Sequence, residues 1–365
     1  MLNLSIIIPV YNVEAYIEEC LASVVAQSDA KANIECIIVD DCSPDGSMDI
    51  VRRFVDNYQG AVQFRTLRHE VTRGISAARN TGVEAATGDY VFFIDSDDYL
   101  MEHGLKTLVD GLLANPDADV VQGNSLFLDK KAYSKRQEPI VLLSKKERLG
   151  ALVNLIFPVN AWNRLIRRNV LINNHIYFVE GIIFEDYLWS YQLMDVAQKV
   201  LVLPQVTYYY RPNANSIMHS RQLKIGKTIY CWDVILTTML KQERNIRGCL
   251  LVNVFSRLLE IQDMIDQHGC SEEELQAFRR LRRRLLKNII SHGRPLLLLF
   301  SLTIFKPFYH IYSFHFVRRN YHILYLQQSG EDIDQQTSPN IALLLEHGCQ
   351  NNIPAINCFA YFQLS

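Results

Sequence analysis

The sequence contains no apolar run long enough to cross a membrane. A helix needs about 20 consecutive apolar residues to span a bilayer, and the longest candidate stretch, Pro295 to Phe305, is too short. The first residues, Met1 to Leu4, lead straight into a strand-like pattern and lack the basic segment and small-residue cleavage site of a secretory signal. We therefore expect a cytoplasmic protein, at most attached peripherally to the cytoplasmic face of the membrane.

The sequence also lacks a strong net charge and a metal-binding cysteine pattern. The formal net charge is −2, which argues against a nucleic-acid binder held by bulk charge. None of the eight cysteines forms a CxxC pair or a Cys/His cluster with zinc-finger spacing. Cys20 and Cys36 lie within apolar patterns, so reduced thiols of a cytosolic protein are the simplest interpretation.

Strand-like and helix-like patterns alternate along the first 130 residues. The predicted strands are 4–9, 34–39, 62–67, 90–94 and 120–122. The predicted helices are 13–26, a helix capped by Ser47, 75–86 and 105–113. Strands that are apolar on both faces and alternate with helices indicate an α/β fold, with a mostly parallel sheet covered on both sides.

The length of 365 residues favours one large domain plus an appendage. The pattern changes after about residue 130, where aromatic residues become frequent, and again beyond about residue 221, where helical spacing dominates. We predict an α/β domain at 1–220, a mainly helical and possible membrane-associating region at 221–328, and a weakly patterned tail at 329–365.

Polar clusters follow three of the predicted strands at the point where each strand ends. Tyr11 and Asn12 follow the first strand, Asp40 and Asp41 the second, and Asp95 begins a longer acidic cluster after the fourth. Ligands of parallel α/β sheets bind outside the carboxyl ends of the strands. The sequence therefore predicts one site at this edge of the sheet.

The cluster Asp95-Ser96-Asp97-Asp98 has the chemistry of a divalent-metal site. Mg2+ and Mn2+ prefer carboxylate oxygens, and typically take one or two from the protein plus phosphate oxygens. A metal held in this way can neutralise the charge of a departing diphosphate. The alternative is an acidic turn in which Asp97 or Asp98 only caps the next helix.

Four ordered motifs resemble those of the family 2 inverting glycosyltransferases of GT-A fold. They are Ile8–Asn12, Val39–Ser47, Gly74–Gly82 and Gly88–Asp98, within a similarity that covers roughly residues 3 to 220. One position departs, because Thr72 stands where the family often has Asn. The resemblance implies a Rossmann-like, mostly parallel sheet flanked by helices, and it implies that the protein binds a nucleotide-sugar and Mg2+ or Mn2+.

The resemblance also implies roles for individual residues. The nucleotide-sugar would be bound by Pro9, Tyr11, Asn12, Asp40, Asp41, Arg79, Asp95 and Ser96. Within that set, Tyr11 would stack on uracil and Asp41, with Asp40 as the alternative, would contact the base. Asp97 would ligate the metal, together with Asp95 and His219.

A second acidic motif, Glu180–Trp189, resembles the family's acceptor-side motif. An inverting transfer needs one base that removes the proton of the acceptor hydroxyl. By resemblance the base is Asp186, with Glu185 as the alternative or as a helix-capping acid. The acceptor side would further include Trp162, Arg164, Trp189 and Arg211, although Trp162 could equally be a core residue.

Six basic residues interleave with leucine in the C-terminal region: Arg279, Arg280, Arg282, Arg283, Arg284 and Lys287. Such a helix suits the surface of an anionic membrane, and a lipid-linked acceptor would explain the contact. The alternative is a helical appendage with a solvated basic face.

The function predicted from the sequence is inverting transfer of a hexose or N-acetylhexosamine from a UDP-sugar to a saccharide hydroxyl, in cell-surface polysaccharide synthesis. A sugar nucleotidyltransferase is the nearest enzymatic alternative, but the segment Pro9–Asn12 is not its Gly-rich phosphate loop. A non-catalytic saccharide-binding subunit is the other alternative, and it predicts a damaged acidic cluster.

Overall fold

The computed structural model describes residues 2–127, 132–153, 156–211, 225–242, 258 and 260–291. The chain forms two compact units, one of residues 1–152 with 156–214, and the other of residues 153–155 with 215–365. The predicted tail at 329–365 and the predicted metal ligand His219 lie outside the described residues.

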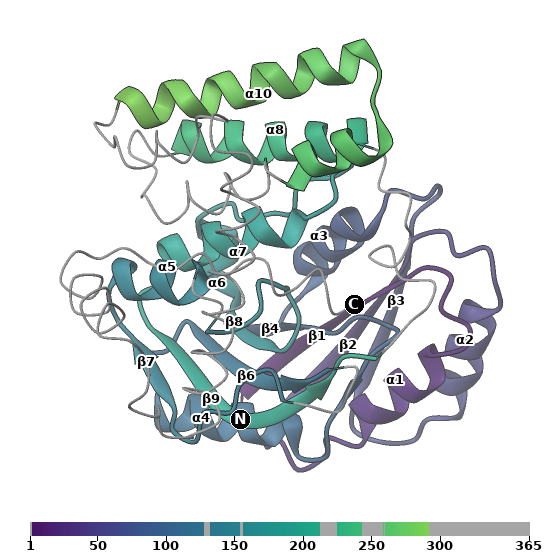
Figure 1. Ribbon diagram of the computed structural model, residues 1–365. Helices are drawn as coiled ribbons and strands as arrows, with labels where there is room; N and C mark the ends of the chain where they lie inside the picture. The colour runs from purple at the N-terminus through teal and green to yellow at the C-terminus, as the bar shows by residue number, and fades with distance from the viewer. Residues whose placement is uncertain are drawn as a thin grey trace, which may run out of the picture. The chain divides into compact units, whose positions relative to one another are not determined.

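The first unit is built on a nine-stranded sheet (Figure 1). Eight of its strands follow the order β3-β2-β1-β4-β8-β6-β9-β5, and the ninth, β7, pairs with β9. The strands are β1 (Leu2–Val10), β2 (Ala32–Asp40), β3 (Gln63–Arg68), β4 (Tyr90–Phe93), β5 (Tyr99–Leu100), β6 (Val120–Leu126), β7 (Ile140–Leu142), β8 (Arg164–Arg167) and β9 (Val200–Tyr209). The five strands predicted from the sequence correspond to β1, β2, β3, β4 and β6 and are confirmed, although β6 extends to Leu126.

The directions of the strands determine at which edge of the sheet the predicted site residues lie. Strands β1 to β4 are parallel, and β8 runs antiparallel to both β4 and β6. Strand β9 is parallel to β6. The carboxyl ends of β1, β2, β4, β6 and β9 therefore lie at one edge of the sheet, and the start of β8 meets them there.

Helices cover both faces of this sheet, as predicted. They are α1 (Ile17–Val25), α2 (Ser47–Asn57), α3 (Ile75–Ala85), α4 (Gly104–Ala114), α5 (Lys145–Val153), α6 (Arg168–Asn173) and α7 (Glu185–Val196). Ile6 and Ile8 of β1 share one core cluster with apolar residues of α1, α2 and α4. Helix α3 contacts β1 and β2 on the other face, where Ile7 points.

Helix α3 lies unusually close to the sheet. A Cβ atom at Gly82 would stand 2.3 Å from the Cγ2 atom of Ile7, which is far inside van der Waals contact. Only glycine permits this approach without displacing the helix. The position of α3 along β1 is therefore fixed by packing, and α3 carries Arg79 and Asn80.

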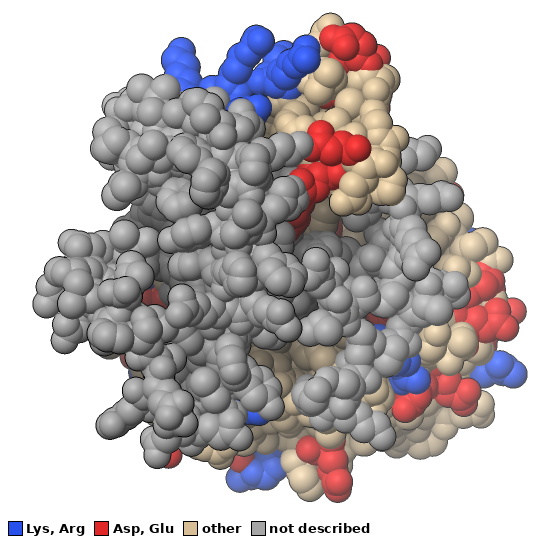
Figure 2. Space-filling model, viewed as in Figure 1, with Lys and Arg blue, Asp and Glu red and all other residues tan. Residues whose placement is uncertain are grey.

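The second unit contains a helical pair, α8 (Ile225–Gln242) and α10 (Glu272–Ser291). The apolar face of α10, made by Phe278, Leu281 and Leu285, is buried. Lys and Arg side chains gather on α10 away from that face (Figure 2). No helix within the described ranges combines the length and the apolar character that a bilayer crossing requires.

Candidate active site

The acidic cluster forms a tight turn after β4. The backbone N–H of Asp98 donates to the carbonyl of Asp95 at 3.0 Å, and Asp95 and Asp97 remain partly exposed. Asp98 is buried, and its carboxylate accepts hydrogen bonds from Tyr208 Oη at 2.7 Å and from the backbone N–H of Arg211 at 2.8 Å. Burial and the neighbouring carboxylates raise the pKa of Asp98.

The helix-cap alternative for Asp98 is therefore wrong. A strand, β5, follows the turn, and α4 begins only at Gly104. Asp98 instead anchors the turn to β9 through Tyr208, whose hydroxyl also accepts a hydrogen bond from the backbone N–H of Asp95 at 3.1 Å. The turn is thus held at both ends by one tyrosine.

Trp162 supports this anchor. Its indole stacks on the Tyr208 ring with centroids 4.5 Å apart and planes at 4°, and its side chain is 1% exposed. A sugar cannot stack on a ring that has no exposed face. The structure therefore favours the core role for Trp162 over the predicted sugar platform.

Two other residues predicted for the acceptor side are also buried. Trp189 stacks on Phe178 at 4.6 Å and contacts Phe93 edge-on. The Arg164 guanidinium donates to Gln122, to Ser190 and to the Pro158 carbonyl. Because burial removes water from this charge, the pKa of Arg164 falls to about 10. Direct acceptor contact by either side chain would require it to leave the core.

Arg211 lies nearer the surface. Its guanidinium pairs with Glu19 at 2.7 Å and stands over the rings of Tyr16 and Tyr99, 5.3 Å from each centroid. The pairing occupies one side of the guanidinium. A role on the acceptor side stays a prediction.

Arg79 is the centre of the site. Its side chain is 1% exposed, and its two terminal nitrogens bind three carboxylates. Nη2 donates to Asp95 at 2.8 Å, while Nη1 donates to Asp186 at 2.8 Å and to Glu185 at 3.1 Å. The three negative charges raise the pKa of Arg79, which keeps the guanidinium protonated.

Glu185 and Asp186 occupy the first turn of α7. Phe184, directly before them, has a left-handed backbone with φ of 63°, so the chain bends sharply into the helix. Burial raises the pKa of Glu185 to about 7, and Asp186 adds to the effect. Burial also raises the pKa of Asp186, against the opposing effect of Arg79. Both acids thus have a pKa above the ordinary value of their type, as is common for groups that exchange protons in active sites.

Asn80 and Arg73 tie the approach to α7 to the α3 region. The Asn80 amide donates to the carbonyl of Phe178 at 2.9 Å and accepts from its N–H at 2.8 Å. Arg73 pairs with Glu180 at 2.9 Å on the surface. Together with the Arg79 contacts, these bonds hold residues 178–186 against α3.

The polar cluster after β2 is mostly engaged in holding the chain. The Asp41 carboxylate accepts from the backbone N–H of Arg73 at 2.9 Å, from that of Gly74 at 2.7 Å, and faces His69 Nδ1 at 2.6 Å. His69 Nε2 lies 3.0 Å from the Thr81 hydroxyl. Asp41 thereby fixes the loop that leads into α3. Asp40 is likewise buried and accepts from the backbone N–H of Ser43 at 2.7 Å.

The end of β1 presents the most exposed candidate. Pro9 is buried in the strand, whereas Tyr11 is 48% exposed and Asn12 adopts a left-handed φ of 55°. The backbone N–H of Asn12 donates to Ser43 Oγ at 2.8 Å. The backbone next to Tyr11 is therefore held at the end of the strand, while the Tyr11 side chain is exposed to solvent.

The donor set fits a hard divalent cation. Among the described residues no group of three or more His, Cys, Asp or Glu side chains could hold a metal, so the protein would supply the two partly exposed carboxylates Asp95 and Asp97. Mg2+ commonly uses one or two carboxylates and completes its shell with phosphate and water oxygens. One oxygen of Asp95 also accepts from Arg79, and the assignment of Asp97 as a metal ligand stays a prediction.

Several residues that organise the site were not found from the sequence. They include Tyr208, His69 and Asn80. Tyr208 is the first of three consecutive tyrosines, and nothing in the local sequence distinguishes it from the other two. Asn80 lay inside a motif that the sequence analysis recognised, but its partner is almost a hundred residues away.

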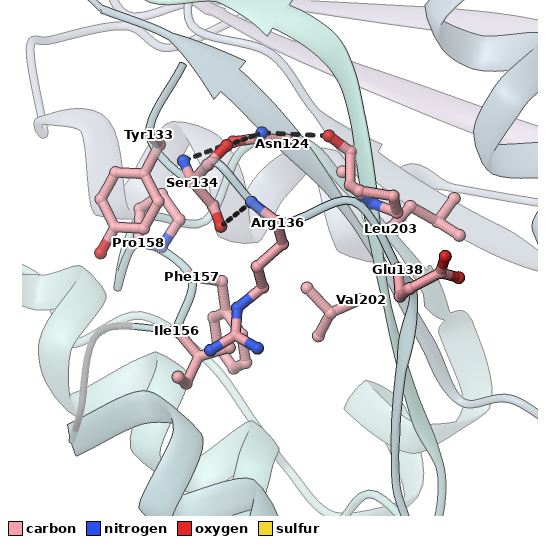
Figure 3. A pocket seen from close by; sticks show the side chains of 12 residues that line it. Asn124, Tyr133, Ser134, Arg136, Glu138, Ile156, Phe157, Pro158, Val202 and Leu203 are labelled. Carbon is pink, nitrogen blue, oxygen red and sulfur yellow. Dashed lines mark hydrogen bonds between the residues drawn. The ribbon is translucent and has the colours of Figure 1, made fainter. Parts of the chain in front are cut away.

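A separate pocket lies beside β6 and β9 (Figure 3). Asn124 organises its rim by donating to the carbonyls of Ser134 at 2.7 Å and Pro204 at 3.0 Å. The Arg136 side chain reaches across the pocket toward Ile156 and Phe157. None of the residues predicted for the site lines this pocket, which sets it apart from the acidic cluster.

Comparison with known proteins agrees with this geometry. Residues 5–174 match the family described as Glycosyl transferase family 2. The chain is 34% identical over 221 residues to the "Uncharacterized glycosyltransferase EpsJ" of Bacillus subtilis, a match that covers 58% of this chain and 62% of that protein. It is 30% identical to the "Poly(ribitol-phosphate) beta-N-acetylglucosaminyltransferase TarS" of Staphylococcus aureus, over 58% of this chain and 35% of that protein.

The fold is also found in solved structures. The crystal structure of S. aureus TarS 1-349 in complex with UDP-GlcNAc superimposes with a TM-score of 0.60 at 21% identity, over 79% of this chain and 81% of that one. This likeness shows the fold, and it confirms the predicted class of a mostly parallel α/β sheet flanked by helices. The chain spans less than two thirds of the length of the curated relatives EpsJ and TarS.

Proposed function

We propose that the protein transfers a hexose or N-acetylhexosamine from a UDP-sugar to a hydroxyl group of a saccharide, on the premise that residues 5–174 match glycosyl transferase family 2. We place the reaction in cell-surface polysaccharide synthesis and assign it an inverting course. The UDP donor is supported by TarS, which has the same fold and was solved with UDP-GlcNAc and with UDP. Transfer to a hydroxyl group is supported by two relatives whose names give poly(ribitol-phosphate), a polymer of a sugar alcohol phosphate, as their acceptor.

One observation carries the proposal. Two acidic pairs that are about ninety residues apart, Asp95 with Asp97 and Glu185 with Asp186, meet at the same edge of the sheet through Arg79. Inverting transfer needs negative groups in two places, to hold the metal–diphosphate and to take a proton from the acceptor. A simple binding protein has no use for a second, partly buried acidic pair.

On the donor side, Tyr11 would stack on the uracil, and Asp95 and Asp97 would hold a divalent cation against the diphosphate. When bound, Mg2+ or Mn2+ neutralises negative charge on the departing diphosphate. Because the carboxylate of Asp41 is already shared by His69 and two backbone N–H groups, its contribution to donor binding would be to shape the loop before α3 as much as to contact the base.

On the acceptor side, Asp186 would accept the proton of the attacking hydroxyl. The acceptor oxygen forms a bond to the anomeric carbon while the bond from that carbon to the diphosphate oxygen breaks. The diphosphate leaves with the electron pair, and the configuration at the anomeric carbon inverts. One carboxylate base suffices, unlike in glycosidases, which use two.

The donor assignment has a direct test. Purified protein is incubated with a panel of UDP-sugars, with Mg2+ or Mn2+ and with EDTA, and UDP release is measured. We expect release from at least one UDP-hexose or UDP-N-acetylhexosamine, only with metal, and calorimetric donor binding that requires the same metal. Tight donor binding in EDTA would contradict the proposed metal requirement. Inactivity toward every UDP-sugar would contradict the proposal that the donor is a UDP-sugar.

We further propose that the basic surface of α10 attaches the protein to the cytoplasmic face of an anionic membrane. Arg280, Arg283 and Lys287 are exposed and spaced so that they lie on one face of the helix. Arg284 is neutralised by Asp233 of α8. Because the apolar face of α10 is buried, attachment would be electrostatic rather than by insertion.

Vesicle binding tests this attachment. Full-length protein should co-sediment with phosphatidylglycerol-containing vesicles at low salt and dissociate at high salt. Each basic residue near an anionic surface contributes about 1 kcal/mol, so replacing Arg280, Arg283 and Lys287 by Gln should weaken partitioning by roughly 100-fold. Replacing the exposed Arg52, Arg53 and Lys146 by Gln is the charge-matched control. Equal losses in the two variants, or no binding of the wild type, would contradict the assignment.

A further inference from the structure

We propose that Arg79 is a positioning residue, which holds the proton-accepting carboxylate of Asp186 at a fixed place relative to the donor-binding carboxylate of Asp95. This role rests on the proposed function. It differs from the sequence-based expectation that Arg79 contacts the nucleotide, because no side of the guanidinium faces solvent.

The contacts of Arg79 leave it little freedom. Nη2 binds Asp95 and Nη1 binds Asp186, each at 2.8 Å, so one rigid planar group spans both carboxylates. The guanidinium carbon stands 5.2 Å from the centroid of the Phe178 ring. A guanidinium that bridges two carboxylates in this way transmits its own position to both.

The backbone that carries Arg79 is itself fixed from three directions. Asp41 binds the N–H groups of Arg73 and Gly74 just before α3. Gly82 packs directly on Ile7 of β1. Asn80 makes two hydrogen bonds with the backbone of Phe178. The Arg79 side chain therefore starts from a rigid helix, and the α7 segment is the part that it locates.

Exposure separates the roles within the cluster. The side chains of Asp95, Glu185 and Asp186 are 20%, 13% and 17% exposed, whereas that of Arg79 is 1% exposed. The carboxylates thus face the substrate side and the guanidinium lies behind them. Arg79 also opposes the effect of burial on Asp186 by favouring its ionised form, which is the form that can accept a proton.

Lysine and methionine variants test the role of Arg79. In Arg79→Met we expect kcat for transfer to fall at least 100-fold, while the donor KM and the calorimetric donor affinity change less than about fivefold. Arg79→Lys keeps the charge but cannot bridge two carboxylates, so it should recover part of kcat. Arg167→Met is the matched control, because Arg167 also pairs with an acid, Asp119, and stands 5.0 Å from an aromatic centroid, that of Tyr90.

A double-mutant cycle separates positioning from general support of the fold. If Arg79 acts through Asp186, Arg79→Met should cost kcat little in an Asp186→Asn background, although it costs much alone. Equal losses in both backgrounds would overturn the proposal, as would a loss that lies mainly in donor affinity. If Arg79→Met does not fold, the same cycle with Arg79→Lys decides.

Amide hydrogen exchange provides a readout that does not depend on activity. We expect faster exchange at residues 185–190 in Arg79→Lys and Arg79→Met than in the wild type, and no such change in Arg167→Met. Unchanged exchange there would overturn the role of Arg79 in locating α7. A wild type that turns over no UDP-sugar would instead overturn the proposed function, so the two failures are distinguishable.

Discussion

Replacing Asp186 by Asn is expected to lower kcat for transfer by about 10³- to 10⁴-fold, with donor affinity nearly unchanged. Asparagine has the shape of aspartate, and its amide oxygen can still accept the hydrogen bond that Arg79 Nη1 donates at 2.8 Å. It cannot accept a proton. Because Asp95 and Asp97 remain in place, the donor should bind as before, and calorimetry beside steady-state kinetics would separate the two effects.

The pH dependence sharpens this expectation. Burial raises the pKa of Asp186, and a base works only when it is ionised. In the wild type kcat should therefore fall as the pH is lowered through a value above the ordinary range of aspartate, about 4. The residual activity of Asp186→Asn should lack this decline.

Glu185→Gln is the matched control for Asp186→Asn. Glu185 shares Arg79 with Asp186 and has a pKa raised to about 7 by burial. If Asp186 is the base, Glu185→Gln should reduce kcat by much less than Asp186→Asn does. The reverse order of the two losses would make Glu185 the base.

Replacing Asp97 by Ala is expected to abolish metal-dependent turnover and to weaken donor binding in the presence of Mg2+ or Mn2+. Asp97 is partly exposed on the turn after β4, two residues beyond Asp95. Loss of a carboxylate ligand removes negative charge that the cation needs. Metal titrations of UDP release and of calorimetric donor binding measure both effects.

Two aspartates serve as controls for Asp97→Ala. Asp117→Ala removes a surface carboxylate that pairs with Lys199, and it should leave the metal response intact. Asp98→Ala should act differently, because it leaves Tyr208 Oη and the Arg211 N–H without their acceptor. A lower melting temperature is expected for it. Full metal-dependent activity in Asp97→Ala would end the assignment of Asp97 as a ligand.

The parallel half of the sheet could be predicted because its strands are buried on both faces. Runs such as residues 4–9 and 34–39 have no other stable place in a soluble domain. Strands β5, β7, β8 and β9 were not predicted. Strand β8 has only four residues and includes two arginines, and β9 contains Pro204 and Gln205. Short or interrupted strands are specified by their neighbours rather than by their own pattern.

The sequence predicted the position of the site better than it predicted the roles of the individual residues. Polar residues at strand ends point to the right edge of the sheet wherever the strands are parallel. Sequence alone does not reveal which of them are buried. Trp162 was predicted as either a sugar platform or a core residue, and Arg79 as a residue of the nucleotide side; each is 1% exposed and contacts other protein groups. Partners such as Tyr208 come from distant strands, and no local spacing encodes them.

The reversed direction of β8 also bears on how such a domain can diversify. Because β8 runs against β4 and β6, the chain reaches this edge of the sheet just before Arg164. The segment that contains Glu185 and Asp186 lies between β8 and β9 in the chain, after the strands β1 to β4 that carry the residues proposed to bind the donor. The length and composition of this segment can change without shifting the register of β1, β2, β3 and β4. On the proposed function, the recipient of the sugar can therefore change separately from its source, with the contacts of α3 to residues 178–186 as the constraint that the two halves share.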